Sequence, residues 1–201
     1  IVGILSAFAF PQIRDWNRSR AVKTDVIRVV NIFDNINSQV QRGLYAFAQV
    51  YMNFEIDQDT GITTLTVTSR GMTADTLGNK ITQDMTFRSE TDRCSLDRED
   101  WDHDGADTDR AEVGQEILNN IETNFNGEEA VCFSKDGRWY STSNFFQGSN
   151  SFEMSGRGGV CDDQDEKGPQ CDYRIVWSRF GNIKLEKWNE RKGESGEWVS
   201  Q

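Results

Sequence analysis

The sequence contains very little histidine and proline, and its negative charges outnumber its positive ones. One of the 201 residues is histidine, two are proline, and 33 acidic residues against 22 basic ones give a formal net charge of −11. A chain this acidic repels phosphate backbones, so we do not favour nucleic acid as a partner. The single histidine, His103, cannot form a zinc site with oxygen ligands at ordinary spacing. No catalytic triad order or phosphate-binding loop stands out, and we expect no enzymatic activity.

Long hydrophobic runs are also missing. The apolar run at residues 1–10 is too short to cross a bilayer as a helix, because crossing takes about 20 apolar residues. Twelve Phe and six Trp in a chain of this length nevertheless favour a packed globular body.

The first 43 residues predict one long helix with two different halves. Residues 1–10 are apolar on all sides, and such a helix must be covered by lipid or by other subunits. Pro11 is expected to bend the helix, and Gly43 is expected to end it. Apolar residues recur at helical spacing through residues 22–40, which predicts an amphipathic half. These residues are Val22, Val26, Val29, Val30, Phe33, Ile36 and Val40.

The helix carries basic residues between its two halves. Arg14, Arg18, Arg20 and Lys23 lie there, with Trp16 among them. Tryptophan and arginine at this position suit a boundary between membrane and water.

Beyond Gly43 the hydrophobic period changes from that of a helix to that of strands. Alternation predicts a hairpin from residues 46–56 and 62–68 around a turn at 57–61. Two more hairpins are predicted at 129–141 and 173–189, with Asp136-Gly137 and Gly181-Asn182 at their turns. Single strands are expected at 84–89 and 149–154, and a short helix at 111–125. The polar tail at 189–201 is expected to be mobile, although its Trp198 can dock.

These elements predict an α+β fold in which a long N-terminal helix packs against antiparallel β-sheets. We divide the chain into an N-terminal helix, residues 1–43, and a β-rich body with acidic loops, residues 44–201.

The N-terminal segment "IVGILSAFAFPQI" and its basic continuation resemble the start of type IV pilins and of type II secretion pseudopilins. Family members begin with a methylated residue and carry a glutamate a few residues later, so about eleven family residues would precede this segment. The two later hairpins resemble those of GspH/FimT-type minor pilins, which implies two sheets packed on the second half of the helix. The resemblance assigns filament assembly to Ile1, Val2, Ile4, Leu5, Phe8, Phe10 and Pro11.

This resemblance implies a structural subunit of a type IV pilus or a similar extracellular filament. Its partners would be copies of itself or other pilins, and it would be anchored in the inner membrane before assembly. A minor pseudopilin of a type II secretion system is one alternative. A membrane-tethered calcium-binding adhesion module, whose helix serves only as an anchor, is another.

Two acidic loops are candidate cation sites. The stretch "DREDWDHDGADTD" places carboxylates at alternate positions before a glycine, as in the first half of a calcium loop, although it lacks the acid of loop position 12. A solvated acidic loop is the alternative. The second loop, residues 161–171, holds Asp162, Asp163, Asp165 and Glu166, and we favour a surface loop there. The proposed Ca²⁺ ligands are Asp100, Asp102, Asp104, Asp107, Asp109 and Glu112.

Four cysteines permit three pairings. Their spacing favours Cys94 with Cys132 and Cys161 with Cys171, which would indicate folding in an oxidising compartment. Four free thiols in a cytosolic protein are the alternative.

Overall fold

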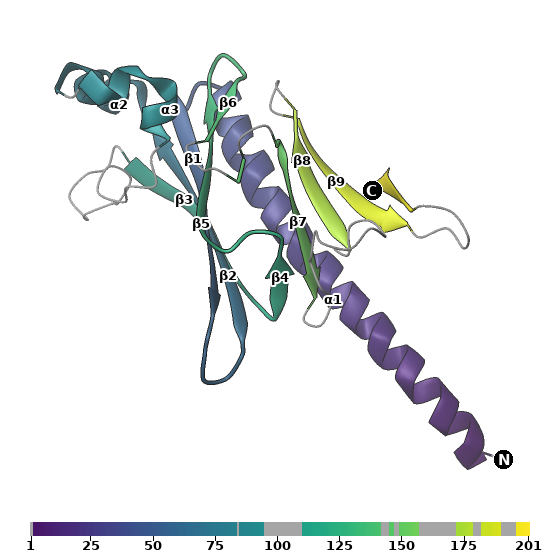
Figure 1. Ribbon diagram of the computed structural model, residues 1–201. Coiled ribbons are helices and arrows are strands. Elements are labelled where there is room, and N and C mark those ends of the chain that lie inside the picture. Colours follow the sequence, from purple (N-terminus) through teal and green to yellow (C-terminus); the bar gives the residue numbers. More distant parts are fainter. Residues whose placement is uncertain are drawn as a thin grey trace.

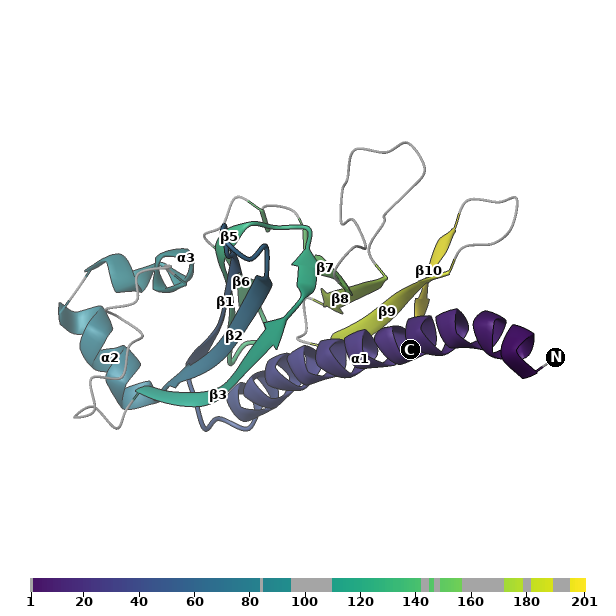
Figure 2. The same ribbon diagram turned by 90° about the horizontal axis from the view of Figure 1, so that it is seen from below.

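The computed structural model is an α+β protein in which one long helix lies along two antiparallel sheets (Figures 1 and 2). It describes residues 2–83, 85–94, 110–141, 145–146, 149–156, 172–178, 182–189 and 196–201. The α+β class and the antiparallel sheets predicted from the sequence are therefore confirmed.

Helix α1 spans Val2–Gln41 and continues through Pro11 as one helix. Its apolar stripe from Val22 to Val40 is buried apart from the half-buried Val30, as the helical spacing predicted. The helix ends where Gly43 takes a φ of +79°, a conformation that costs glycine little. The Gly43 and Leu44 amides donate to the carbonyls of Val40 and Gln39, which makes this end a Schellman motif.

The first sheet has the strand order β3-β2-β1-β5-β6. Strands β1 and β2 pair from Phe47↔Met72 to Ile56↔Thr63, so the predicted hairpin at 46–68 is confirmed and extends to residue 72. The predicted hairpin around Asp136-Gly137 is confirmed as β5 and β6. The strands are β1 (Phe47–Ile56), β2 (Thr63–Met72), β3 (Arg110–Asn119), β5 (Gly127–Ser134) and β6 (Trp139–Tyr140).

The second sheet has the order β10-β9-β8-β7-β4. The predicted strand at 149–154 is confirmed as β7, and the predicted hairpin at 173–189 as β8 and β9. The strands are β4 (Ile121–Thr123), β7 (Ser151–Gly156), β8 (Tyr173–Trp177), β9 (Ile183–Asn189) and β10 (Glu197–Ser200).

The main core lies where α1 meets both sheets. Phe33 of α1 contacts Phe133 of β5 edge-on and stacks against Trp177 of β8, with ring centroids 6.2 and 5.7 Å apart. Phe152 of β7 completes this group at 5.9 Å from Phe33. One helix side chain therefore joins the two sheets, and the second half of α1 is an integral part of the body.

A second, smaller core lies on the opposite face of the first sheet. Helices α2 (Ala74–Gln83) and α3 (Glu90–Arg93) and the 3₁₀ helix η1 (Met85–Arg88) cover it. Leu77 and Ile81 of α2 pack against it, and the disulfide between Cys94 and Cys132 ties the end of α3 to β5. The cluster is Phe47, Met72, Phe87, Cys94, Ala130 and Cys132.

The helix predicted at 111–125 is wrong, because residues 110–119 form β3 and residues 121–123 form β4. Strand β3 pairs with β2 along its length, with an irregularity at Ser69/Arg70. This pairing buries Leu118 and leaves Ile117 exposed, a two-residue alternation that outweighs the helical spacing of the apolar residues.

Two further expectations are also corrected. The strand predicted at 84–89 is wrong, since residues 85–88 form η1, where Phe87 turns inward to the second core. Helix α2 before it was not predicted. The tail predicted to be mobile contains β10, which pairs with β9. Trp198 docks on Trp188 with ring centroids 5.3 Å apart.

Candidate assembly surface

The two halves of α1 lie in different surroundings. The second half is buried against the sheets, whereas Figures 1 and 2 show the first turns extending past them. Six of the predicted assembly residues are in this helix, and Ile1 lies outside the described residues. The six are Val2, Ile4, Leu5, Phe8, Phe10 and Pro11. The first turns of α1 are therefore an apolar segment that projects from the body, and the buried second half of the helix holds them in place.

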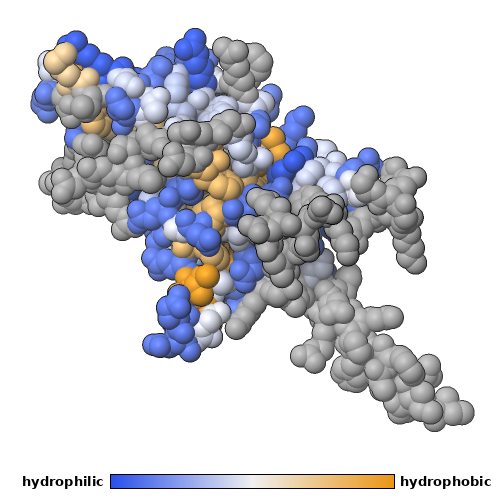
Figure 3. Space-filling view, viewed as in Figure 1, coloured by the Kyte–Doolittle hydropathy of each residue, from blue (hydrophilic) through white to orange (hydrophobic). Residues whose placement is uncertain are grey.

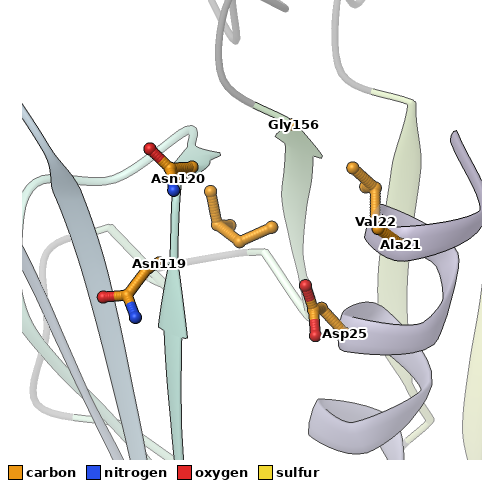
Figure 4. Close-up of a pocket in the computed structure, with 7 residues that line it drawn as sticks. Ala21, Val22, Asp25, Asn119, Asn120 and Gly156 are labelled. Atoms are coloured by element: carbon orange, nitrogen blue, oxygen red, sulfur yellow. The ribbon is translucent and has the colours of Figure 1, made fainter. Parts of the chain in front are cut away.

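A hollow of about 420 Å³ opens beside α1 (Figure 4). The corner between β3 and β4 forms one wall, α1 forms the other, and Gly156 at the end of β7 closes one end. Val22 and Ile121 provide apolar surface, while Asp25, Asn119 and Asn120 provide polar atoms. We call this hollow the stem pocket; Ala21 completes its lining.

The β3–β4 corner is held by hydrogen bonds. Asn120 has a φ of +60°, and its backbone amide donates to the Thr63 carbonyl at 2.8 Å. The Thr64 hydroxyl donates to Oδ1 of Asn119 at 3.3 Å. Asparagine tolerates this left-handed conformation better than most residues do. The chain can therefore turn sharply from the edge of one sheet to the edge of the other, which creates the wall of the stem pocket.

An ion-pair network lies beside the stem pocket. Arg28 of α1 donates to the carboxylate of Asp25 at 3.2 Å and also pairs with Glu116 of β3. Partial burial opposes its charge, but the hydrogen bonds and charges of Glu116 and Asp25 outweigh this and raise the pKa of the Arg28 guanidinium. Arg28 therefore bridges a carboxylate on α1 and a carboxylate on β3.

Most of the proposed Ca²⁺ ligands cannot be placed. Asp100, Asp102, Asp104, Asp107 and Asp109 lie outside the described residues, as do His103 and the second acidic loop at 161–171. Glu112 is in β3, where its Cα is paired with that of Arg70. Within the described part of the chain, no three potential metal-ligating side chains come together. Calcium binding stays a prediction.

One of the two predicted disulfides is confirmed. Cys94 and Cys132 are bonded, with their Cα atoms 5.7 Å apart, as their spacing favoured. Cys161 and Cys171 lie outside the described residues.

A buried carboxyl group, Glu129 of β5, was not predicted. Its side chain lies on the same face of the strand as Val131 and Phe133, beside Met52 of β1. Only 9% of the residue is exposed, and Oε2 has no hydrogen-bond partner. Burial raises its pKa from 4.5 to about 7. The signal was present in the sequence, because Glu129 occupies an inward position in the alternation of residues 129–133.

The face of the molecule drawn in Figure 3 is largely polar. Figure 3 shows hydrophobic surface in small separate areas on a mainly hydrophilic face. Ile56 and Ile62 are exposed at the β1–β2 hairpin, and Ile117 on β3 is 54% exposed. In the described helices no apolar stretch is long enough to traverse a membrane.

Comparison of the chain with protein-family models, curated proteins and solved structures gives no match.

Proposed function

We propose that this protein is a structural subunit of a type IV pilus-like extracellular filament that polymerises through the first half of α1. The observation that carries the proposal is the division of this helix. Its second half is held in the core by both sheets, and its first half extends past them with an apolar sequence. Packed parallel to copies of itself, that segment would bury its apolar surface in the filament centre.

Small residues support close packing of these segments. Gly3, Ser6, Ala7 and Ala9 interrupt the larger apolar residues, and small side chains allow helix backbones to approach closely. The acidic, disulfide-bonded body would then face solvent. Before assembly the same segment would help to anchor the chain in the inner membrane.

The proposal is tested by placing a charge in the apolar segment. Leu5→Asp should abolish filament formation, because an aspartate buried among helices has no partner. Electron microscopy of cells that produce the chain, with mass spectrometry of the sheared filaments, measures the effect. Asn31→Asp is the matched control, since this side chain is exposed in the second half of α1.

Two outcomes of the Leu5→Asp experiment would count against filament assembly through α1. Filaments that contain the Leu5→Asp chain at the wild-type level would contradict assembly through this helix. A chain that stays in the membrane fraction and never enters filaments would favour the tethered adhesion module.

A further inference from the structure

We infer that the second sheet binds a neutral oligosaccharide on the face that is turned away from α1. The site is formed by Trp188 and Trp198 together with Asp172, Arg174 and Glu186, and we call these five residues the tryptophan cluster. The inference goes beyond the proposed function and does not depend on it, because none of these residues belongs to α1.

The strand register places the tryptophan cluster on one face of the sheet. Ile175 of β8 is fully buried in the core beside α1, so its neighbour Arg174 faces the other way (Figures 1 and 2). Glu186 of β9 is the partner of Arg174 and shares this face. Two residues further along β9, Trp188 also faces outward and is paired with Trp198 of β10.

Neighbouring groups hold the two indole rings in place. Their centroids are 5.3 Å apart, and the ring planes meet at 66°. The Arg174 guanidinium lies 4.6 Å from the centroid of the Trp198 ring, and Glu186 binds this guanidinium through Oε2 at 2.6 and 2.9 Å. Gly196 packs against Trp188 so closely that a Cβ has no room there. Both tryptophans still keep part of their surface exposed. A ligand therefore meets an ordered surface, which lowers the entropic cost of binding.

Four polar groups of the tryptophan cluster have no hydrogen-bond partner in the described part of the chain. The Asp172 carboxylate accepts the Ser155 hydroxyl at Oδ2, which leaves Oδ1 without a partner. Glu186 uses only Oε2 for Arg174, so its Oε1 is also unpartnered. The other two groups are the indole N–H groups of Trp188 and Trp198. Two donors and two acceptors are thus available beside the aromatic surface.

This combination favours a sugar over other kinds of ligand. A sugar ring has a C–H surface that can pack against aromatic rings, and its hydroxyl groups both donate and accept hydrogen bonds. A purely apolar ligand would cover the polar groups without giving them partners, which is unfavourable. The two free carboxylate oxygens would repel an anion. Arg174 already occupies the position over Trp198 that a cationic ligand would take.

Calorimetric titration of the purified full chain tests the inference. The probes are four neutral hexasaccharides with different linkages or sugars, namely maltohexaose, cellohexaose, laminarihexaose and chitohexaose. We expect at least one of them to bind with a Kd below about 1 mM. Absence of binding by all four at about 10 mM sugar would overturn the inference.

Two variants then locate the binding site. Trp198→Phe keeps a ring that attaches β10 and removes the indole N–H, and Asp172→Ala removes an acceptor from an exposed position. Each should weaken binding about two- to tenfold, the range for one hydrogen bond or one aromatic contact. Lys184→Ala is the matched control, because this exposed side chain shares the outer face of β9 and should leave the Kd unchanged. Chemical unfolding verifies that all three variants remain folded.

The contrary results are distinct. Wild-type affinity in both Trp198→Phe and Asp172→Ala would overturn the site, and so would tighter binding of anionic hexagalacturonate than of every neutral sugar. A dimer of the full chain that dissociates in Trp198→Phe would assign this face to a second copy and also overturn the inference. The Leu5→Asp chain should bind the sugar as wild type does, so a failure of filament assembly and a failure of sugar binding can be told apart.

Discussion

The buried carboxyl group of Glu129 makes a specific prediction about stability and pH. Its pKa is raised from 4.5 to about 7, because burial disfavours the ionised form. The folded protein therefore holds this proton more tightly than the unfolded chain does. The tighter binding of this proton stabilises the folded protein fully below about pH 4.5, and this contribution is lost as the pH rises towards 7. Between pH 5 and pH 8 the loss amounts to about 2–3 kcal/mol, from linkage between these two pKa values.

Glu129→Gln should remove this dependence, because glutamine is neutral at every pH. Chemical unfolding followed by the fluorescence of buried Trp177 measures the free energy of unfolding of both proteins at several pH values. We expect the stability of the variant relative to wild type to increase by about 2–3 kcal/mol from pH 5 to pH 8. In a thermal scan near the upper pH this corresponds to roughly 5–10 °C in Tm.

The control is Glu128→Gln, which removes an exposed carboxylate from the preceding position of β5. A stability difference between Glu129→Gln and wild type that stays constant from pH 5 to pH 8 would refute the reasoning. It would mean that the Glu129 carboxylate finds water or a cation in the folded protein.

Three further predictions concern the disulfide, the core and the acidic loop. Replacing Cys94 and Cys132 by alanine should cost roughly 4 kcal/mol of unfolding free energy, because their separation of 38 residues closes a long loop. Phe33→Ala should cost about 3–5 kcal/mol, since it removes the ring that joins both sheets, and chemical unfolding measures both effects. Calcium should bind with a Kd of roughly 10⁻⁴–10⁻³ M, as in extracellular modules, and Asp100→Asn with Asp104→Asn should weaken binding in calorimetry.

Each of these has a distinct contrary result. An unfolding free energy unchanged in the double alanine variant would contradict the role of the disulfide. A cost below about 1 kcal/mol for Phe33→Ala would mean that the two sheets do not depend on this ring. No calorimetric heat at millimolar Ca²⁺ would favour a solvated acidic loop.

Parts of the fold could be predicted because their signals are local. The buried residues of α1 recur at a helical period. Gly43 ends the helix with a φ of +79°, which glycine adopts at low cost. In β1 and β2, alternating apolar residues show which face is buried. The pairing of Cys94 with Cys132 was favoured by the spacing of the four cysteines in the sequence.

Other parts could not be predicted, since the decisive interaction is distant in sequence. Residues 111–125 have apolar residues at helical spacing, yet β3 forms because β2, about 50 residues earlier, offers an unpaired edge. In helix α2, Leu77 and Ile81 are four residues apart and share one face. The Thr73 hydroxyl caps the start of the helix by accepting a hydrogen bond from the Thr76 backbone amide at 3.3 Å. These signals are weak without the second core that they cover.

The sequence by itself determined the long helix, its apolar and amphipathic halves, the hairpins and the acidic charge, because each depends on neighbouring residues. Only the tertiary structure decided that Phe33 joins two sheets, that Glu129 is buried without a partner at Oε2, and that Asp25 and Asn119 line one pocket. The burial of Phe33 and Glu129 and the stem pocket arise where α1 and both sheets meet. Their physical origin is contact between residues far apart in the chain, such as Phe33 and Trp177 at 144 positions, which no local pattern encodes.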